Sequence, residues 1–441
     1  MLLRFRVANH GSIRDEMTIA LTTSAMRGAT PPGGDWLQAT TRVAGLYGPN
    51  AAGKSTMLDA MDHLVRATRH SATRWAERGA FPYVPFALDD VSSSEPSLYE
   101  IDLVSGGIRY TFGFRSTAKG ILEEWLYSYP SGRRRVLYER DGDTFSFGRH
   151  LTGDNVVLGK ATKPTSLFMS SAANNRHQII SPIHHQISRH IKYARLSESD
   201  RQSRLQWIMG SVEREGGLLD LAGALLRFAD VGITGVKVRE ETPTDEVARV
   251  VRKIHEALAT DESNKADLER LMEQMARKLQ FVHESSGSDA GALLELAQES
   301  SGTVAWLSLA VPAIDALKRG DLFLVDEIDS SLHPSLTSQL IQMFKSGRLN
   351  RSGAQLVFTS HDTSLLGGLH GKILDPEEIW LAEKAGDGAT DIYSAAEFSI
   401  RSRDNIERRY LQGRYGAVPM FSADDLEAVL AEAGGTLRAS A

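Results

Sequence analysis

Residues 48–55 read Gly-Pro-Asn-Ala-Ala-Gly-Lys-Ser, which matches the P-loop pattern G-x-x-x-x-G-K-[ST] at every fixed position. The glycines let backbone N–H groups curl around a phosphate, Lys54 can reach the β- and γ-phosphates, and Ser55 can ligate Mg²⁺. We therefore predict that this stretch binds ATP together with Mg²⁺. The residues predicted to bind the nucleotide are Gly48, Pro49, Asn50, Ala51, Ala52, Gly53, Lys54, Ser55 and Thr56.

The segments on either side of the loop fit the same prediction. Val43–Tyr47 is a short apolar run that predicts a buried central strand. From Lys54 to about Arg69 the apolar residues recur at helical spacing, which predicts an amphipathic helix. A helix that starts at the loop adds its positive N-terminal dipole to the phosphate site. An ordinary glycine turn is the alternative, and the strand–loop–helix order argues against it.

The composition excludes several classes of protein. The chain has 441 residues, of which 41% are hydrophobic and 24% are charged, so wholesale disorder is excluded. A net charge of −6 argues against a dedicated polyanion coat protein but leaves room for a local basic groove. Because the chain has no cysteine, disulfides, thiolate zinc sites, iron–sulfur clusters and cysteine nucleophiles are excluded.

The sequence predicts no contact with a membrane. Its first residues, MLLRFRVANHGS, lack the apolar region of a signal peptide. The longest apolar stretch, Val304–Leu317, is too short to span a bilayer and contains Ser308, Pro312 and Asp315. We therefore expect a cytoplasmic protein.

A second motif follows a predicted strand in the last third of the chain. Leu322–Val325 is apolar and leads directly into Asp326 and Glu327. Many strands end in acidic residues, so the pattern is informative only beside a P-loop in the same chain. Asp326 is then predicted to hold Mg²⁺ with Ser55, and Glu327 to polarise the attacking water as a general base.

With three further segments, these motifs resemble the ABC-type ATPases, in the branch that contains RecF, the SMC proteins and the OLD phage-defence ATPases. Residues 299–303, Glu-Ser-Ser-Gly-Thr, occupy the place of the ABC signature. Residues 329–334, Asp-Ser-Ser-Leu-His-Pro, resemble the D-loop. His361 follows the predicted strand Gln355–Thr359, where the family has its switch histidine.

The resemblance assigns roles to these positions. It implies that Ser301 and Gly302 contact the γ-phosphate held by the opposite protomer of a head-to-tail homodimer or higher homo-oligomer. It also implies that His361 senses the γ-phosphate, which completes a catalytic set with Lys54 and Glu327. The expected fold is α/β: an ABC-type P-loop ATPase head, built from a parallel sheet plus an antiparallel β-layer, with an inserted helical lobe.

A narrower resemblance is to the RloA/AbiL-like family of bacterial ATPases. It implies a role in anti-phage defence by abortive infection, beside a separately encoded effector such as a nuclease or toxin. The stretches that carry this resemblance, besides the signature, are residues 2–6, 12–15, 85–89, 229–233 and 410–417.

The sequence departs from the ABC pattern in three places. No glutamine occurs between Gln38 and Gln178, where the family has a lid-loop glutamine, and Asp89 is the suggested substitute. The signature lacks a second glycine. Only 80 residues follow His361, without a convincing acidic metal cluster, so the fused Toprim nuclease of the OLD enzymes is not expected.

Three regions are predicted along the chain: 1–164, the N-terminal half of the head with the P-loop; 165–285, the helical lobe; and 286–441, the C-terminal half of the head. Strands are predicted near residues 2–7, 17–22, 99–103, 109–114, 124–129 and 135–139. The lobe is predicted to be mostly helical, with a helix at Leu218–Phe228, a strand at Ile233–Val238 and a short helical hairpin from Thr242 to Leu279.

Two alternative functions stay open on the sequence. One is a DNA-repair ATPase of the RecF or SMC type, which would bind DNA along the helical lobe. The other is a scaffold that binds ATP tightly and hydrolyses it slowly. Arg133–Arg135 is interpreted as a solvated hairpin face, with nucleic-acid contact as the alternative. The histidines between His177 and His190 are interpreted as part of a polar helical surface, with a metal or ribonuclease site as the alternative.

Overall fold

A computed structural model describes the protein over most of its length. The described residues are 1–26, 28–211, 217–229, 232–241, 249–250, 253, 276–285, 291–368, 371–401 and 404–418. Within these ranges, no helix combines the length and the apolar character needed to cross a membrane.

A six-stranded sheet forms the centre of the molecule, in the order β16-β15-β3-β14-β13-β9. All neighbouring strands are parallel except β15 and β16, which are antiparallel. β3, β13 and β14 are buried along their whole length, as expected for parallel strands covered on both faces. The strands are β3 (Val43–Tyr47), β9 (Ile191–Ala194), β13 (Leu322–Val325), β14 (Gln355–Thr359), β15 (Ile379–Lys384) and β16 (Thr390–Ser394).

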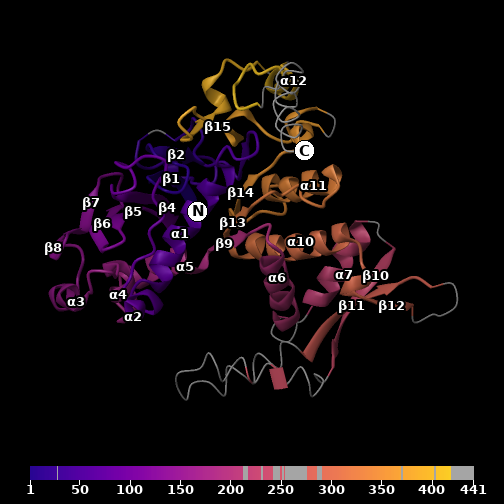
Figure 1. The fold of residues 1–441 in the computed structure, drawn as a ribbon, viewed down its shortest axis with the longest axis horizontal. Coiled ribbons are helices and arrows are strands. Elements are labelled where there is room, and N and C mark those ends of the chain that lie inside the picture. Colours follow the sequence, from indigo (N-terminus) through magenta and orange to yellow (C-terminus); the bar gives the residue numbers. More distant parts are fainter. Residues whose placement is uncertain are drawn as a thin grey trace, which may run out of the picture.

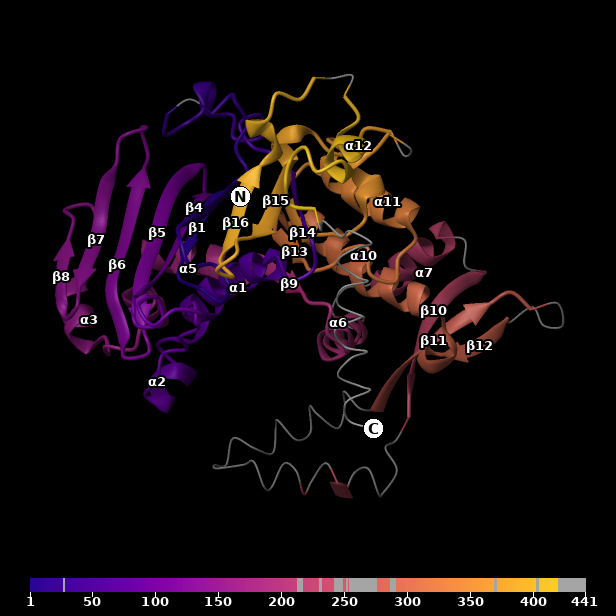
Figure 2. The same ribbon diagram turned by 45° about the horizontal axis from the view of Figure 1, so that its top comes forward.

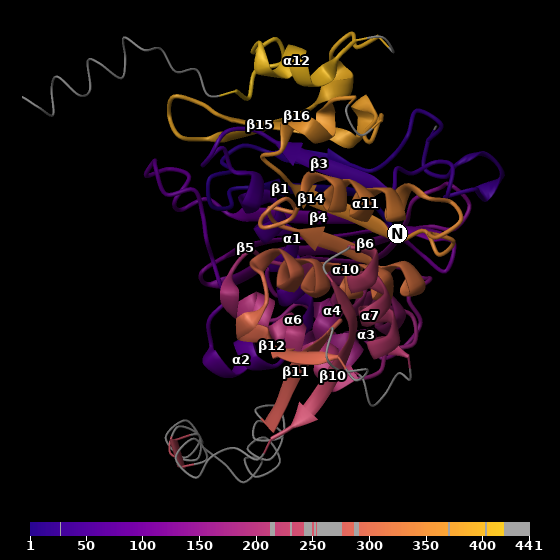
Figure 3. The same ribbon diagram turned by 90° about the vertical axis from the view of Figure 1, so that its right-hand side faces the viewer.

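Helices cover both faces of this sheet. Successive side chains of a strand point to opposite faces, so each face contributes to a separate core. Val43 and Tyr47 of β3 share a core with α10 (Ser301–Arg319) and α11 (Pro334–Lys345). Ala44 and Leu46 share the other core with α1 (Lys54–His70). In Figure 3, β3, β14 and α10 lie in the middle of the molecule, with α12 (Ile406–Leu411) at one end.

A seven-stranded antiparallel sheet forms a second layer, in the order β2-β1-β4-β5-β6-β7-β8. One face packs on α1, α4 (Phe168–Asn174) and α5 (Ile180–Arg189) (Figure 1). The strands are β1 (Leu2–Ala8), β2 (Met17–Ala20), β4 (Ser97–Ser105), β5 (Ile108–Thr117), β6 (Gly120–Tyr129), β7 (Arg135–Asp141) and β8 (Thr144–Phe147).

A smaller unit lies beside α10, on the side away from the antiparallel sheet (Figure 2). Its elements are α6 (Glu198–Ser211), α7 (Leu218–Phe228), β10 (Ile233–Glu240), β11 (Arg277–His283) and β12 (Ala292–Glu295). Trp306 of α10 joins the unit to the head, because its Nε1 donates a hydrogen bond of 2.8 Å to the Leu225 carbonyl oxygen.

The remaining elements are short. They are α2 (Arg74–Arg78), α3 (Asn155–Ala161), and the 3₁₀ helices η1 (Pro32–Gly34), η2 (Leu296–Gln298), η3 (Thr363–Leu366), η4 (Pro376–Glu378) and η5 (Ala395–Glu397).

The predicted fold class is confirmed: a parallel sheet with helices on both faces adjoins an antiparallel β-layer. The predicted strand at Val43–Tyr47 and helix at Leu218–Phe228 have the predicted bounds. The predicted helix up to Leu279 is wrong at its end, because Leu279 pairs with Val238 in a β-ladder between β10 and β11. The rest of that helical hairpin lies largely outside the described residues.

The region predicted as a helical lobe, 165–285, also contains parts that pack in the head. α4 and α5 share a core with α1, and β9 pairs in parallel with β13. The division into 1–164, 165–285 and 286–441 as domains stays a prediction.

Candidate functional site

The P-loop joins the buried strand β3 to the first turn of α1. Gly48 (φ 153°) and Gly53 (φ 98°) both have positive φ, which favours glycine. A Cβ atom on Gly48 would collide with the carbonyl oxygen of Ala382, and one on Gly53 would collide with the Thr390 hydroxyl. Both fixed glycines of the motif are therefore required by the fold as well as by the pattern.

Lys54 lies folded back along the loop that precedes it. Its Nζ donates hydrogen bonds of 2.9 Å to the carbonyl oxygens of Gly48 and Pro49. Burial lowers the pKa of Lys54 to about 8, although the carboxylates of Glu327 and Asp326 act in the opposite direction. Two neutral carbonyls are weak partners for a buried ammonium, so an anion in the loop would compete for it.

Ser55 and Asp326 meet although 270 residues separate them in the sequence. Ser55 Oγ and Thr359 Oγ1 each donate a hydrogen bond of 2.7 Å to the same carboxylate oxygen, Oδ1 of Asp326. A hydroxyl and a carboxylate side by side fit Mg²⁺, which binds one or two carboxylates and takes its other ligands from water and phosphates. The two residues predicted as metal ligands are therefore adjacent.

Glu327 has the left-handed backbone conformation, with φ 49°, which is uncommon for a residue that is not glycine. Its backbone N–H donates a hydrogen bond of 2.7 Å to Thr359 Oγ1. Thr359 is fully buried at the end of β14. Because its hydroxyl accepts from the Glu327 N–H and donates to the Asp326 carboxylate, it links the two acids. No local pattern in the sequence marks Thr359 as a site residue, and only its place beside the two acids reveals its role.

An open cavity of about 820 Å³ lies over the loop. It brings together Lys54, Ser55, Glu327 and His361, four of the predicted site residues. Two further polar residues, which the sequence analysis did not select as site residues, line it as well: Ser12 and Lys384. The complete lining is Ser12, Asn50, Ala51, Ala52, Gly53, Lys54, Ser55, Thr56, Glu327, His361 and Lys384.

Ser12 joins the N-terminal sheet to the P-loop. Its hydroxyl lies 3.1 Å from Thr56 Oγ1 and 2.8 Å from Thr390 Oγ1. The Thr390 hydroxyl in turn donates a hydrogen bond of 2.9 Å to the Ala52 carbonyl oxygen. The loop is thus braced from β16 and from the turn after β1.

Ser301 and Gly302 do not lie at the P-loop of their own chain. They form the first turn of α10, where Ser300 is the N-cap and accepts a hydrogen bond from Thr303 N–H. Ser301 is exposed and borders a separate cavity of about 590 Å³, which α6 and β11 also line. A Cβ on Gly302 would lie 3.1 Å from the Ser331 carbonyl oxygen, so the helix start packs against residues 329–334.

Comparison with protein families matches residues 43–367 to the family described as "AAA domain, putative AbiEii toxin, Type IV TA system". The chain belongs to this family. No curated protein matches the chain.

Solved structures similar to this chain include two SMC heads. One, an SMC head bound to the C-winged helix domain of ScpA, is 12% identical with a TM-score of 0.40; the match covers 89% of this chain and 97% of that one. The other, the SMC head domain from Thermotoga maritima, is 13% identical with a TM-score of 0.37; the match covers 89% of this chain and 98% of that one.

Asp89, the suggested substitute for a lid-loop glutamine, does not line the cavity over the P-loop. Its carboxylate accepts hydrogen bonds from the backbone N–H (2.6 Å) and the hydroxyl (2.8 Å) of Ser92. These bonds hold the pKa of Asp89 below its usual value. Asp89 stabilises a turn in this structure, and its role as a substitute for the glutamine stays a prediction.

Two of the histidines between 177 and 190, His177 and His184, have separate structural partners. His177 Nε2 lies 2.9 Å from Asn155 Oδ1, and His184 Nε2 lies 2.9 Å from the Thr68 carbonyl oxygen. Burial lowers the pKa of both histidines, so they are neutral near pH 7. In the described part of the AAA protein, no group of three or more histidines and acids is placed to hold a metal ion.

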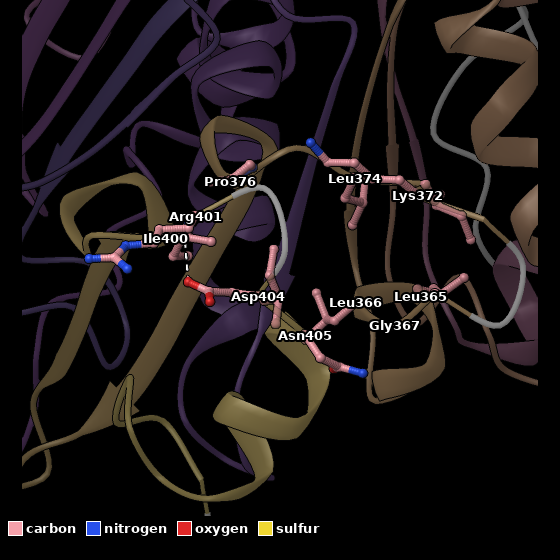
Figure 4. A pocket seen from close by; sticks show the side chains of 13 residues that line it. Leu365, Leu366, Gly367, Lys372, Leu374, Pro376, Ile400, Arg401, Asp404 and Asn405 are labelled. Carbon is pink, nitrogen blue, oxygen red and sulfur yellow. Dashed lines mark hydrogen bonds between the residues drawn. The ribbon is translucent and has the colours of Figure 1, made fainter.

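A smaller cavity of about 470 Å³ lies between η3 and α12 (Figure 4). Leu366, Leu374 and Ile400 give it an apolar wall, and Asp404 accepts a hydrogen bond of 2.8 Å from the Arg401 backbone N–H at its edge. None of the predicted site residues lines this cavity of the AAA protein.

Proposed function

We propose that the protein is an ATPase in which ATP closes two copies head to tail and hydrolysis reopens them. The observation that carries the proposal is the network in which Ser55 and Thr359 both donate to Asp326 while Thr359 holds the backbone of Glu327. This network lies under a cavity that Lys54 and His361 also line. The family description, an AAA domain, supports the same function.

Each residue then has a chemical role. Lys54 leaves the two loop carbonyls and binds the β- and γ-phosphates. Ser55 and Asp326 hold Mg²⁺, which when bound neutralises charge that develops on the phosphates. Glu327 takes a proton from the attacking water, and His361 contacts the γ-phosphate from the far side of the cavity. Positioning and charge stabilisation, rather than covalent chemistry, lower the barrier.

The second copy supplies the missing side of the site. Ser301 is exposed, and the first N–H groups of a helix have no intrahelical partners, so the start of α10 suits an anion. Because Ser301 lies outside the cavity over its own P-loop, it serves the γ-phosphate of a partner. ATP then bridges the two copies twice, once at each composite site.

In the cell we assign the protein to anti-phage defence by abortive infection, as an RloA/AbiL-like switch in the cytoplasm that controls a separate nuclease or toxin. The resemblance of the sequence supports this role, as does the family description, which names a putative AbiEii toxin and a type IV TA system. Regions 1–164 and 286–441 form the two halves of the head in this proposal, and region 165–285 forms the inserted lobe apart from α4, α5 and β9, which pack in the head.

One observation favours slow turnover, the scaffold alternative. In the described part of the chain no glutamine lines the cavity, and the Asp89 carboxylate is bonded to Ser92 instead. A site without a lid-loop ligand closes less readily around the water that attacks the γ-phosphate. Hydrolysis is then slow, and the protein holds ATP for long periods between turnovers.

Lys54→Ala tests the nucleotide site. Removing the ammonium takes away a charge-assisted contact to the phosphates, so ATP affinity falls by at least about tenfold in calorimetry. The phosphates of bound ATP should raise the pKa of Lys54 again from its lowered value of about 8, because they stabilise the charged ammonium. At pH 8 the wild-type protein therefore takes up about half a proton from the buffer on binding ATP, and the variant does not.

Exposed Lys372, which does not line the P-loop cavity, is the matched control. Lys372→Ala should bind ATP with wild-type affinity and wild-type proton uptake. Unchanged ATP affinity in Lys54→Ala would show that the loop is not a nucleotide site.

A substitution at Thr359 tests the hydrogen-bond network around Asp326 and Glu327. Thr359→Val removes the donor to Asp326 and leaves the Glu327 N–H without its acceptor, so we expect turnover to fall by at least about tenfold. The Mg²⁺ concentration for half-maximal turnover should rise as well, which loss of packing alone would not cause. Thr359→Ser keeps the hydroxyl and should restore both values; equal defects in the two variants would exclude this positioning role.

A further inference from the structure

Three aromatic rings form a row on the outer face of the seven-stranded sheet. Trp125, Tyr127 and Tyr129 alternate along β6, and side chains two residues apart on a strand point to the same face. All three are half-buried, whereas Leu126 and Ser128 between them are buried. Successive rings in such a row are about 7 Å apart along the strand.

The indole of Trp125 lies against the backbone of the neighbouring strand. Trp125 pairs with Gly113 of β5, and a Cβ on Gly113 would come within 2.5 Å of the indole. The indole Nε1 donates a hydrogen bond of 2.9 Å to Glu100 Oε2, which fixes the edge of the ring. One face of the indole thus covers the sheet, and its exposed part faces solvent.

Arginines extend this flat surface over the two tyrosines. The Arg134 guanidinium lies 4.5 Å from the centre of the Tyr127 ring, and that of Arg109 lies 4.8 Å from the centre of the Tyr129 ring. Arg133–Arg135 is exposed in the hairpin after β6. Arg109 forms an ion pair of 2.7 Å with Asp102. Among the described residues, Arg133, Arg134 and Arg135 have no acidic group within ion-pair distance. The row therefore ends at a cluster of positive charge.

Two acids of this face, Glu100 and Asp102, lie beneath its arginines. Glu100 and Asp102 are 6% and 2% exposed, whereas Arg4, which forms ion pairs with both at 2.9 and 3.1 Å, is 37% exposed. The carboxylates of Glu100 and Asp102 are thus covered, and Glu139 is half-buried and accepts a hydrogen bond of 2.7 Å from the Tyr127 hydroxyl. Guanidinium planes and aromatic rings are turned outward beside these three acids. Such planes stack on nucleic-acid bases.

We propose that this face binds single-stranded DNA, with bases stacked on the rings and phosphates beside the Arg133–Arg135 hairpin. Sheets with aromatic rings at alternate positions stack two or three bases in this way. The indole N–H and the Tyr127 hydroxyl are already bonded to Glu100 and Glu139, so neither is left for the 2′-hydroxyl by which a site prefers RNA. The stacking surface is defined as Trp125, Tyr127, Tyr129, Arg109 and Arg134.

The test measures anisotropy of a labelled oligothymidylate of about 20 nucleotides with the full chain, without ATP, at about 50 mM salt. We expect saturable binding that quenches tryptophan fluorescence, and the matching oligouridylate should bind no more tightly than the oligothymidylate. Trp125→Leu should weaken binding by about tenfold, and Trp125→Phe should restore most of it. Arg134→Ala with Arg135→Ala should also weaken binding and reduce the salt slope by about 1.4.

Arg348→Ala with Arg351→Ala, two exposed arginines in the loop after α11, is the matched control and should bind as the wild type does. Thermal unfolding of each variant verifies that the sheet is intact. Absence of saturable binding overturns the proposal. So does a duplex that binds as tightly as the single strand, or binding unchanged in both Trp125→Leu and the double arginine variant. The test is done without ATP, so its outcome is independent of the proposed ATPase function.

Discussion

Glu327→Gln should bind ATP with wild-type affinity, hydrolyse it at least about 100-fold more slowly, and accumulate as a closed dimer. The amide keeps the shape and hydrogen-bonding capacity of the carboxylate but cannot take a proton from water. The substitution keeps the same Cβ, so the left-handed backbone at φ 49° and its bond to Thr359 are unaffected. Hydrolysis is what reopens the dimer, and closure should therefore persist.

Phosphate release and light scattering with ATP and Mg²⁺ measure the two effects. Glu377→Gln, an exposed position on η4, is the matched control and should behave as the wild type. Wild-type turnover in Glu327→Gln would place the base elsewhere. Loss of turnover without any dimer would separate the chemistry from the proposed switch.

Ser301→Glu should abolish ATP-dependent dimerisation and hydrolysis together while the monomer still binds ATP. The new carboxylate would stand where the partner's γ-phosphate has to approach the start of α10, and the two negative charges repel each other. Ser301 is exposed and lies outside its own P-loop cavity, so ATP affinity of the monomer should change little. Ser301→Ala adds no charge and should retain most of the dimerisation.

Mixing Ser301→Glu with Lys54→Ala makes the test sharper. In a head-to-tail dimer of the two variants, one composite site carries both changes and the other carries neither. Some phosphate release should therefore return if the two sites work independently. Hydrolysis at the wild-type rate by Ser301→Glu alone would contradict the composite site and the role assigned to residues 299–303.

Parts of this architecture that depend on contiguous residues could be predicted from the sequence. The β3–loop–α1 unit is specified by an apolar run, two glycines and a helical period, all within 30 residues, and its bounds are as predicted. Asp326 and Glu327 were recognisable because a fully apolar strand precedes them.

Other parts depend on long-range pairing, which no local pattern encodes. β9 has only four residues and joins the central sheet because β13 offers it a free edge. Lys384 reaches the cavity only because β15 pairs with β3. Leu279 fits a helical period by coincidence, and two neighbouring strands fix it in β11 instead.

The order of strands in the central sheet also has a consequence for biosynthesis. β3 ends at Tyr47, but its neighbours β14 and β15 begin only at Gln355 and Ile379. While the ribosome makes the chain, the P-loop strand therefore stays without a partner until most of the protein has emerged. Such distant pairings slow folding and leave apolar strands exposed in the meantime. Nascent chains of this protein should depend strongly on chaperones, and fragments that end before β14 should aggregate rather than bind nucleotide.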